Sequence, residues 1–324
     1  MSTTVKKAEI HCHIEGAASP ALVRKQAAKY GVDVSSFLDN NGYVWSDFTS
    51  FLQAYDGAAG LFRTPEDYAE LAETYLSDIA TEGAIYAEVF LSTDHAEQAG
   101  LSAQAYIDAL GEGMYRARQR SGVECRMILT GVRHFGVEAV EKAARIAATR
   151  PHELVTGFGM AGDERSGRVT DFARAFDIAR DAGLGITIHA GEFGGPQSVR
   201  DALDIVRPSR IGHGARAIED SALVSRLAKE GVVLELCPGS NVALKVFADW
   251  ASHPFETFRR EGLKVTLNSD DPPHFHSSIG NEYEMAAKTW GYDRAQLTDF
   301  TRTAIKAAFV DEPTREKLLG QLVD

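Results

Sequence analysis

The sequence has few cysteines and no long apolar run. Three cysteines occur in 324 residues, Cys12, Cys125 and Cys237, and an odd number without paired spacing is typical of a reducing compartment rather than a disulfide framework. Nowhere do about 18 apolar residues follow one another, and residues 1–7 lack the apolar core of a signal peptide. We therefore predict a cytoplasmic protein with no membrane partner.

Positive charge is also scarce. The chain has 34 Lys and Arg against 46 Asp and Glu, a formal net charge of -12. No run of basic residues forms a stripe that could follow a phosphate backbone, so nucleic acid is excluded as a partner and a small neutral substrate is favoured. No Gly-x-Gly-x-x-Gly follows an early strand, which removes the commonest motif of the alternative architecture, an open doubly wound sheet.

Apolar strand patterns alternate with helical patterns along most of the chain. The predicted strands are 8–13, 84–91, 124–130, 154–159, 185–189, 210–213, 232–237 and 265–269. Eight strands alternating with helices, most units being roughly 25 to 40 residues long, predict an α/β fold of the (β/α)8 TIM-barrel type. We expect one domain spanning residues 1–324, because no linker or low-complexity tract divides the chain.

Two regions depart from this alternation. After the first strand and its helix, the turn Asn40-Asn41-Gly42 is followed by aromatic residues at spacings of three and four. This pattern predicts short inserted helices, whose aromatic side chains either fill the core or form a lid over a pocket. Beyond the last strand, residues 294–308 and 312–322 are predicted to form extra C-terminal helices.

Polar side chains stand at the ends of four predicted strands. They are His11 with His13, His189 with Glu192, His213, and Asp270 with Asp271. Because the carboxyl ends of barrel strands meet on one face, these side chains are expected to converge there. Several imidazoles and a carboxylate suit zinc or another borderline divalent metal. The remaining groups have the types needed for a general acid, a general base and a substrate anchor, which indicates a catalytic site.

Six motifs in order along the chain resemble the adenosine deaminase family of the amidohydrolase superfamily. They are His11-Cys12-His13-Ile14-Glu15-Gly16, Met160-Ala161-Gly162-Asp163-Glu164, His189-Ala190-Gly191-Glu192, Ile211-Gly212-His213-Gly214, Cys237-Pro238-Gly239-Ser240-Asn241 and Asn268-Ser269-Asp270-Asp271-Pro272. The signature of the cytidine-type deaminases, His-x-Glu with Pro-Cys-x-x-Cys, is absent.

The resemblance implies roles for several of these motif residues. His11, His13, His189 and Asp270 would hold one zinc ion per subunit. Glu192 would protonate N1 of a purine as water adds at C6, and His213 would orient that water and help take its proton. Asp271 would contact N7, and the backbone N–H of Gly162 would contact N3.

The resemblance also implies a substrate, for which one residue leaves alternatives open. We expect adenosine and 2'-deoxyadenosine to be deaminated to inosine and 2'-deoxyinosine in purine salvage. Glu15 replaces the Asp that usually reaches the ribose, and relatives that act on adenine often carry Glu there. Adenine or another N6-amino purine is therefore the alternative substrate, unless Glu15 still bonds a ribose hydroxyl. An inactive nucleoside-binding relative is disfavoured because the whole ligand set and the acid are present. The oligomeric state stays open.

Overall fold

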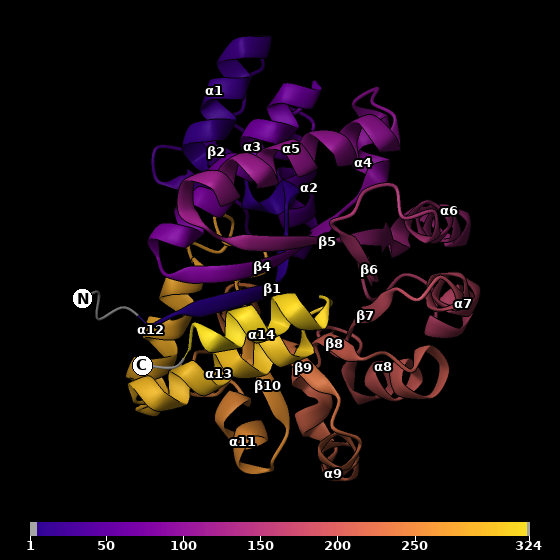
Figure 1. The fold of residues 1–324 in the computed structure, drawn as a ribbon, viewed down its shortest axis with the longest axis vertical. Helices are drawn as coiled ribbons and strands as arrows, with labels where there is room; N and C mark the ends of the chain where they lie inside the picture. The colour runs from indigo at the N-terminus through magenta and orange to yellow at the C-terminus, as the bar shows by residue number, and fades with distance from the viewer. Residues whose placement is uncertain (1–4, 323–324) are drawn as a thin grey trace.

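Eight parallel strands form a nearly closed barrel in the computed structural model, which describes residues 5–322 (Figure 1). The strands neighbour one another in the order β1 (Lys7–His13), β4 (Ala84–Leu91), β5 (Glu124–Val132), β6 (Val155–Ala161), β7 (Gly185–Ala190), β8 (Arg210–His213), β9 (Val233–Leu236) and β10 (Lys264–Leu267). Cys12 pairs with Asp270 across the remaining gap, and the His13 N–H donates to the Asp270 carbonyl at 3.0 Å. The predicted α/β barrel of the TIM type is confirmed.

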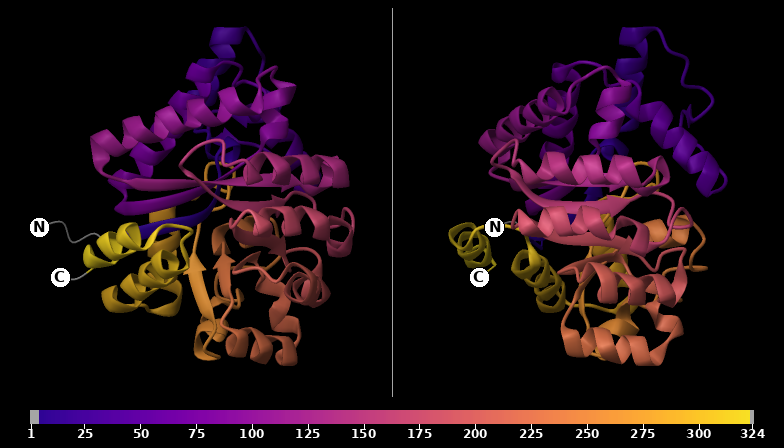
Figure 2. Two further views of the ribbon diagram at one scale, coloured as in Figure 1. Left: turned by 45° about the vertical axis from the view of Figure 1, so that its right-hand side comes forward. Right: turned by 90° about the vertical axis from the view of Figure 1, so that its right-hand side faces the viewer.

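Helices surround the barrel, and most of them cover its outside. They are α1 (Pro20–Tyr30), α2 (Phe48–Ala59), α3 (Pro65–Thr81), α4 (Thr93–Gln98), α5 (Ala103–Ser121), α6 (Val137–Ala148), α7 (Ala173–Asp181), α8 (Gly195–Asp201), α9 (Ser221–Glu230), α10 (Pro238–Ala243), α11 (Phe255–Arg260), α12 (Ile279–Trp290), α13 (Arg294–Ala307) and α14 (Glu312–Gly320). Helices α6, α7 and α8 follow one another around the outside, and α1 to α5 lie together at one end (Figures 1 and 2). Strands covered in this way are buried on both faces, which explains their continuous apolar runs.

Local residues define the ends of several helices. The Ser19 side chain accepts from the Leu22 N–H at the start of α1, and Gly31 ends that helix in the left-handed conformation at φ 64°. Thr64 and Asp67 form a reciprocal capping box before α3. These side chains satisfy backbone groups that have no partner inside the helix, so they define its ends.

The segment 32–64 differs from the predicted run of short helices. It forms an antiparallel hairpin, β2 (Leu38–Asp39) and β3 (Gly42–Tyr43), followed by the single helix α2. The predicted turn lies at the hairpin tip, and Asp47 caps α2 through the Ser50 N–H. Sequence analysis also misses the short helices α4 and α10 and the longer α12, because their apolar positions are too few or are interrupted by polar residues.

Two further observations concern the described chain. The cysteines Cys12, Cys125 and Cys237 are buried and unpaired. No helix among residues 5–322 is both long enough and apolar enough to cross a membrane.

Candidate active site

Four histidines and an aspartate converge at the carboxyl ends of the strands. β1 supplies His11 and His13, β7 supplies His189, β8 ends at His213, and Asp270 follows β10. Potential ligand atoms of His11, His189, His213 and Asp270 all lie within 4.8 Å of one another, and His13, Asp270 and Asp271 form an overlapping group. His13 Nε2 lies 3.1 Å from His189 Nε2 and 3.4 Å from Asp270 Oδ1. The structure therefore brings together every predicted metal ligand.

The backbone at this site is constrained. His213 and Asp270 have φ of 58° and 64°, in the left-handed region that non-glycine residues seldom adopt. A Cβ at Gly212 would lie 2.7 Å from His11 Cε1, so only glycine fits beside that imidazole. Conformations of this kind cost of order 1–3 kcal/mol each and persist where the surrounding structure enforces them, often at functional sites.

Three of the four imidazoles favour the neutral form that binds a metal, and the fourth lies between carboxylates. Burial lowers the pKa of His13 to about 3 and of His213 to about 4, and it lowers the pKa of His189 well below its usual value. At His11 burial acts in the same direction, but the nearby carboxylates of Asp270 and Glu235 outweigh it and raise the pKa to about 10. The two carboxylates thus create a place where positive charge is favourable.

Unpartnered nitrogens support a metal at this place. His189 Nδ1 is buried and has no hydrogen-bond partner within the described chain, and the buried His11 Nε2 makes no hydrogen bond there but lies 3.5 Å from Asp270 Oδ1. Imidazole nitrogens and a carboxylate are ligands that zinc accepts, so a buried metal site of three histidines and an aspartate fits these residues. Both His13 and His213 lie beside Asp270, with His13 Nε2 3.4 Å from Oδ1 and His213 Nε2 3.9 Å from Oδ2, so the predicted ligand His13 and the predicted water-orienting His213 both belong to this site.

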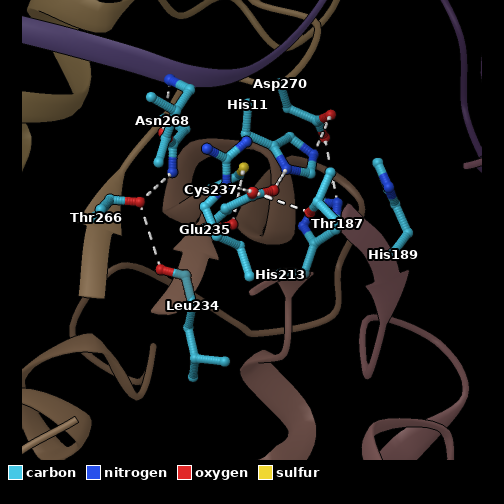
Figure 3. Close-up of polar contacts among 12 residues, drawn as sticks. His11, Thr187, His189, His213, Leu234, Glu235, Cys237, Thr266, Asn268 and Asp270 are labelled. Carbon is cyan, nitrogen blue, oxygen red and sulfur yellow. Dashed lines mark hydrogen bonds and ion pairs between the residues drawn. The ribbon is translucent and has the colours of Figure 1, made fainter. Parts of the chain in front are cut away.

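A buried chain of charges orients His11. Its Nδ1 lies 2.7 Å from Glu235 Oε2, on the side of the ring opposite Asp270 (Figure 3). The Thr187 hydroxyl donates to Glu235 Oε1 at 2.9 Å. Arg210, fully buried, pairs with both Glu235 and Glu88. A carboxylate on one imidazole nitrogen fixes the tautomer and presents the other nitrogen to a metal.

Sequence reasoning missed this charge chain. A lone charged residue in a mainly apolar strand is the feature of the sequence that could have revealed it. Such residues are Glu88 in β4, Arg210 at the start of β8 and Glu235 in β9. Buried charges need partners, so three of them in the strands of one barrel indicate ion pairs inside it.

Glu192 lies beside the metal site with a carboxyl that favours its neutral form. Burial raises its pKa well above the usual value, and the charges of Asp270 and Glu164 act in the same direction. The Asn241 side-chain amide donates to Glu192 Oε1 at 3.3 Å and lies 3.3 Å from His213 Nδ1. This amide therefore orients both groups; sequence analysis quoted Asn241 within a motif but gave it no role.

A cavity opens onto these groups. It is bounded on one side by Phe51, Leu52 and Tyr55 of α2. Its lining includes the predicted residues His13, Glu15, Gly162, His189, Glu192, His213, Asp270 and Asp271. His11 lies behind the lining at 0% exposure. Asp271 Oδ1 is buried without a partner in the described chain, so it is available to a ligand.

Glu15 forms part of the cavity wall. It follows β1 in a 3-10 turn, 1% exposed, and its oxygens accept from the Tyr106 and Tyr55 hydroxyls and from the Ser92 N–H. Burial raises its pKa. The Glu15 carboxyl is therefore fixed by donors from three other segments of the chain.

Comparison with known proteins agrees with this arrangement. The adenosine deaminase family model matches residues 6–324. A protein of Chelativorans sp. (strain BNC1) named adenine deaminase is 66% identical over 98% of this chain and 97% of its own. Seven further curated relatives of the same name are 57–61% identical.

Solved structures resemble the barrel closely. The crystal structure of an adenine deaminase from Arthrobacter aurescens superimposes with a TM-score of 0.91 at 26% identity, covering 98% of each chain. An amidohydrolase from Burkhoderia ambifaria with bound Zn has the same fold, with a TM-score of 0.89 at 24% identity, over 98% of this chain and 89% of that one. This chain, with its buried metal site and full-length match, belongs to the adenosine deaminase family of hydrolases.

Proposed function

We propose that the protein hydrolyses adenine to hypoxanthine and ammonia. The observation that carries this proposal is the full-length similarity, at 57–66% identity, to relatives that are all named adenine deaminase. The expected conversion of adenosine and 2'-deoxyadenosine is corrected accordingly. The predicted contacts of Gly162 and His213 are with N3 and with the attacking water, which adenine and adenosine share, so these two residues do not distinguish the base from its nucleoside.

The surroundings of Glu15 support a free base. Its carboxyl is tied to the cavity wall by Tyr106, Tyr55 and Ser92 and so is not free to follow a ribose hydroxyl. Free adenine carries an N–H on its imidazole ring that adenosine lacks. The Glu15 carboxylate, which lines the cavity, can accept a hydrogen bond from this N–H. A site built around such a hydrogen bond rejects the analogue that lacks the donor by about 10⁴-fold.

The chemical step needs an acid, because the C6 carbon of adenine is a poor electrophile until the adjacent N1 is protonated. Glu192 supplies that proton: its raised pKa keeps the carboxyl protonated and Asn241 aims it. Once N1 is protonated, charge no longer builds up on the ring as water adds at C6.

His213 and Asp271 complete the arrangement. His213 remains a neutral imidazole that accepts the proton of the attacking water. Burial raises the pKa of Asp271, so its neutral carboxyl donates to N7, which is an acceptor, and the backbone N–H of Gly162 donates to N3. Zinc held by the histidines and Asp270 would make water a competent nucleophile at neutral pH by lowering its pKa to about 7.

Product analysis tests the proposal. Zinc-loaded protein incubated with adenine is expected to release hypoxanthine and ammonia in equal amounts, measured by chromatography and an ammonia-coupled assay. Zinc-loaded protein that leaves adenine unchanged would refute the proposal.

A further inference from the structure

The loop that carries Glu192 is held by one buried carboxylate, that of Glu164. Four successive backbone N–H groups donate to it: Gly191 at 2.6 Å, Glu192 at 3.0 Å, Phe193 at 2.6 Å and Gly194 at 2.8 Å. The Ser198 hydroxyl is a fifth donor. Successive N–H groups turned to one point form a concave anion-binding nest, and here a side chain of the same chain fills it.

The loop residues are shaped around this carboxylate. A Cβ at Gly194 would lie 2.7 Å from Glu164 Oε1, so a larger residue would push the carboxylate away. Gly191 has φ 76°, and a Cβ there would lie 2.3 Å from Val199 Cγ2. Glycine at position 194 leaves room for the Glu164 oxygens, and glycine at position 191 allows a left-handed backbone packed against Val199.

The opposite side of the loop is fixed as well. The Arg216 N–H donates to the Gly191 carbonyl at 2.8 Å, and the Arg216 guanidinium donates to the Phe193 carbonyl at 2.6 Å. The backbone N–H groups of the loop thus face Glu164, while two of its carbonyl groups face Arg216. Glu164 is 7% exposed, so water does not readily replace it as the acceptor.

We propose that Glu164 is a positioning residue for Glu192: its carboxylate fixes the backbone of residues 191–194, so that the Glu192 carboxyl meets Asn241 and faces the cavity. The inference rests on the proposed role of Glu192 as the acid. Misplacement of a catalytic group by about 1 Å is sufficient to cost about 10²-fold in rate. Substrate binding depends mainly on other groups, so the expected loss is in kcat rather than KM.

Glu164→Gln tests this with almost no change of shape. Glutamine has one acceptor oxygen, so its NH2 group must face N–H donors that now have no acceptor. We expect kcat for adenine to fall by about 10²-fold, with KM within threefold of the wild type and zinc content unchanged. Glu164→Asp keeps the negative charge but has a side chain one methylene shorter, so its kcat is expected to lie between that of the wild type and that of Glu164→Gln. If Glu164→Gln does not fold, Glu164→Asp provides the test instead.

Asp163→Asn is the matched control. It makes the same chemical change at the next residue, where the carboxylate pairs with Arg165 near the surface. Its kcat is expected within threefold of the wild type. Full kcat in both Glu164 variants, or a loss in Asp163→Asn equal to that in Glu164→Gln, overturns the inference.

Hydrogen–deuterium exchange provides a readout that does not depend on turnover. In Glu164→Gln the amides of residues 191–194 are expected to exchange at least tenfold faster than in wild type and in Asp163→Asn. Unchanged protection would contradict the positioning role. A wild type without adenine deaminase activity refutes the proposed function instead, and exchange still decides whether Glu164 fixes the loop.

Discussion

Replacing Glu235 by glutamine separates the charge behind His11 from the shape of the site. Glu235 is completely buried, and its Oε2 lies 2.7 Å from His11 Nδ1. An amide oxygen at this place can still accept from Nδ1, so the tautomer survives while the negative charge is lost. Partners of this kind typically contribute 10- to 100-fold to metal affinity. The zinc Kd is therefore expected to rise 10- to 100-fold, which weakens the binding free energy by about 1.4 to 2.8 kcal/mol.

The same substitution perturbs the Arg210 pair. Arg210 keeps Glu88 as a partner but loses Glu235, and removing one member of a buried ion pair costs about 3 to 5 kcal/mol of stability. Zinc affinity must therefore be measured where both proteins remain folded, as checked by circular dichroism. Metal-free protein is titrated with zinc against a fluorescent indicator of known affinity at constant pH.

Thr187→Val provides the control for this measurement. It removes the hydroxyl that donates to Glu235 Oε1 but leaves the contact between Oε2 and His11. Its zinc Kd is expected within threefold of the wild type. A folded Glu235→Gln protein with the zinc Kd of Thr187→Val would refute the reasoning that the Glu235 charge strengthens His11 as a ligand.

Four further substitutions address separate parts of the account. Glu192→Gln should keep zinc yet lower kcat by about 10²- to 10⁴-fold, the usual contribution of a general acid; near-normal turnover would remove Glu192 from that role. Asp270→Ala should lower bound zinc in metal analysis, and full zinc content would exclude it as a ligand. Glu15→Asp should narrow the preference for adenine over adenosine in kcat/KM, since the shorter side chain vacates part of the wall; an unchanged ratio would show that Glu15 does not set specificity. His253 donates to Asn241, and burial lowers its pKa to about 3. Between about pH 3 and 6.5 the imidazole is therefore protonated in the unfolded chain but neutral in the folded one, so its contribution makes the free energy of unfolding rise with pH. His253→Gln should reduce that slope by up to about 1.4 kcal/mol per pH unit in denaturant titrations, and an identical slope would contradict the pKa shift.

The barrel could be predicted because its signals are local. Each strand is a short apolar run followed by polar residues, and many helix ends carry their own caps, such as Ser19 and Thr64. The convergence of His11, His189 and Asp270 followed from the topology, since strand ends share one face of a barrel.

The residues that sequence analysis missed act through distant partners. Glu235 is read as an ordinary strand residue until the closed barrel brings His11, 224 positions away, against it. Glu164 was visible only as part of a motif, because its five donors come from a loop and helix 27 to 34 positions further on. Which partner reaches a buried charge depends on packing that one sequence does not encode locally.

The substrate was misjudged for a related reason. The direction of Glu15 depends on Tyr106 and Ser92, which lie 91 and 77 positions away. One methylene of extra length does not by itself distinguish a carboxyl that reaches for ribose from one that is tied to the cavity wall. The motifs indicate the chemistry that members of the family share. The choice of purine depends instead on how the cavity wall holds the Glu15 carboxyl.

The ratio of kcat/KM for adenine to that for adenosine, measured with one preparation of zinc-loaded protein, tests the central claim most directly. Both substrates are followed by the loss of ultraviolet absorbance on deamination. We predict a preference for adenine of about 10⁴-fold. Equal values, or a preference for adenosine, would contradict it.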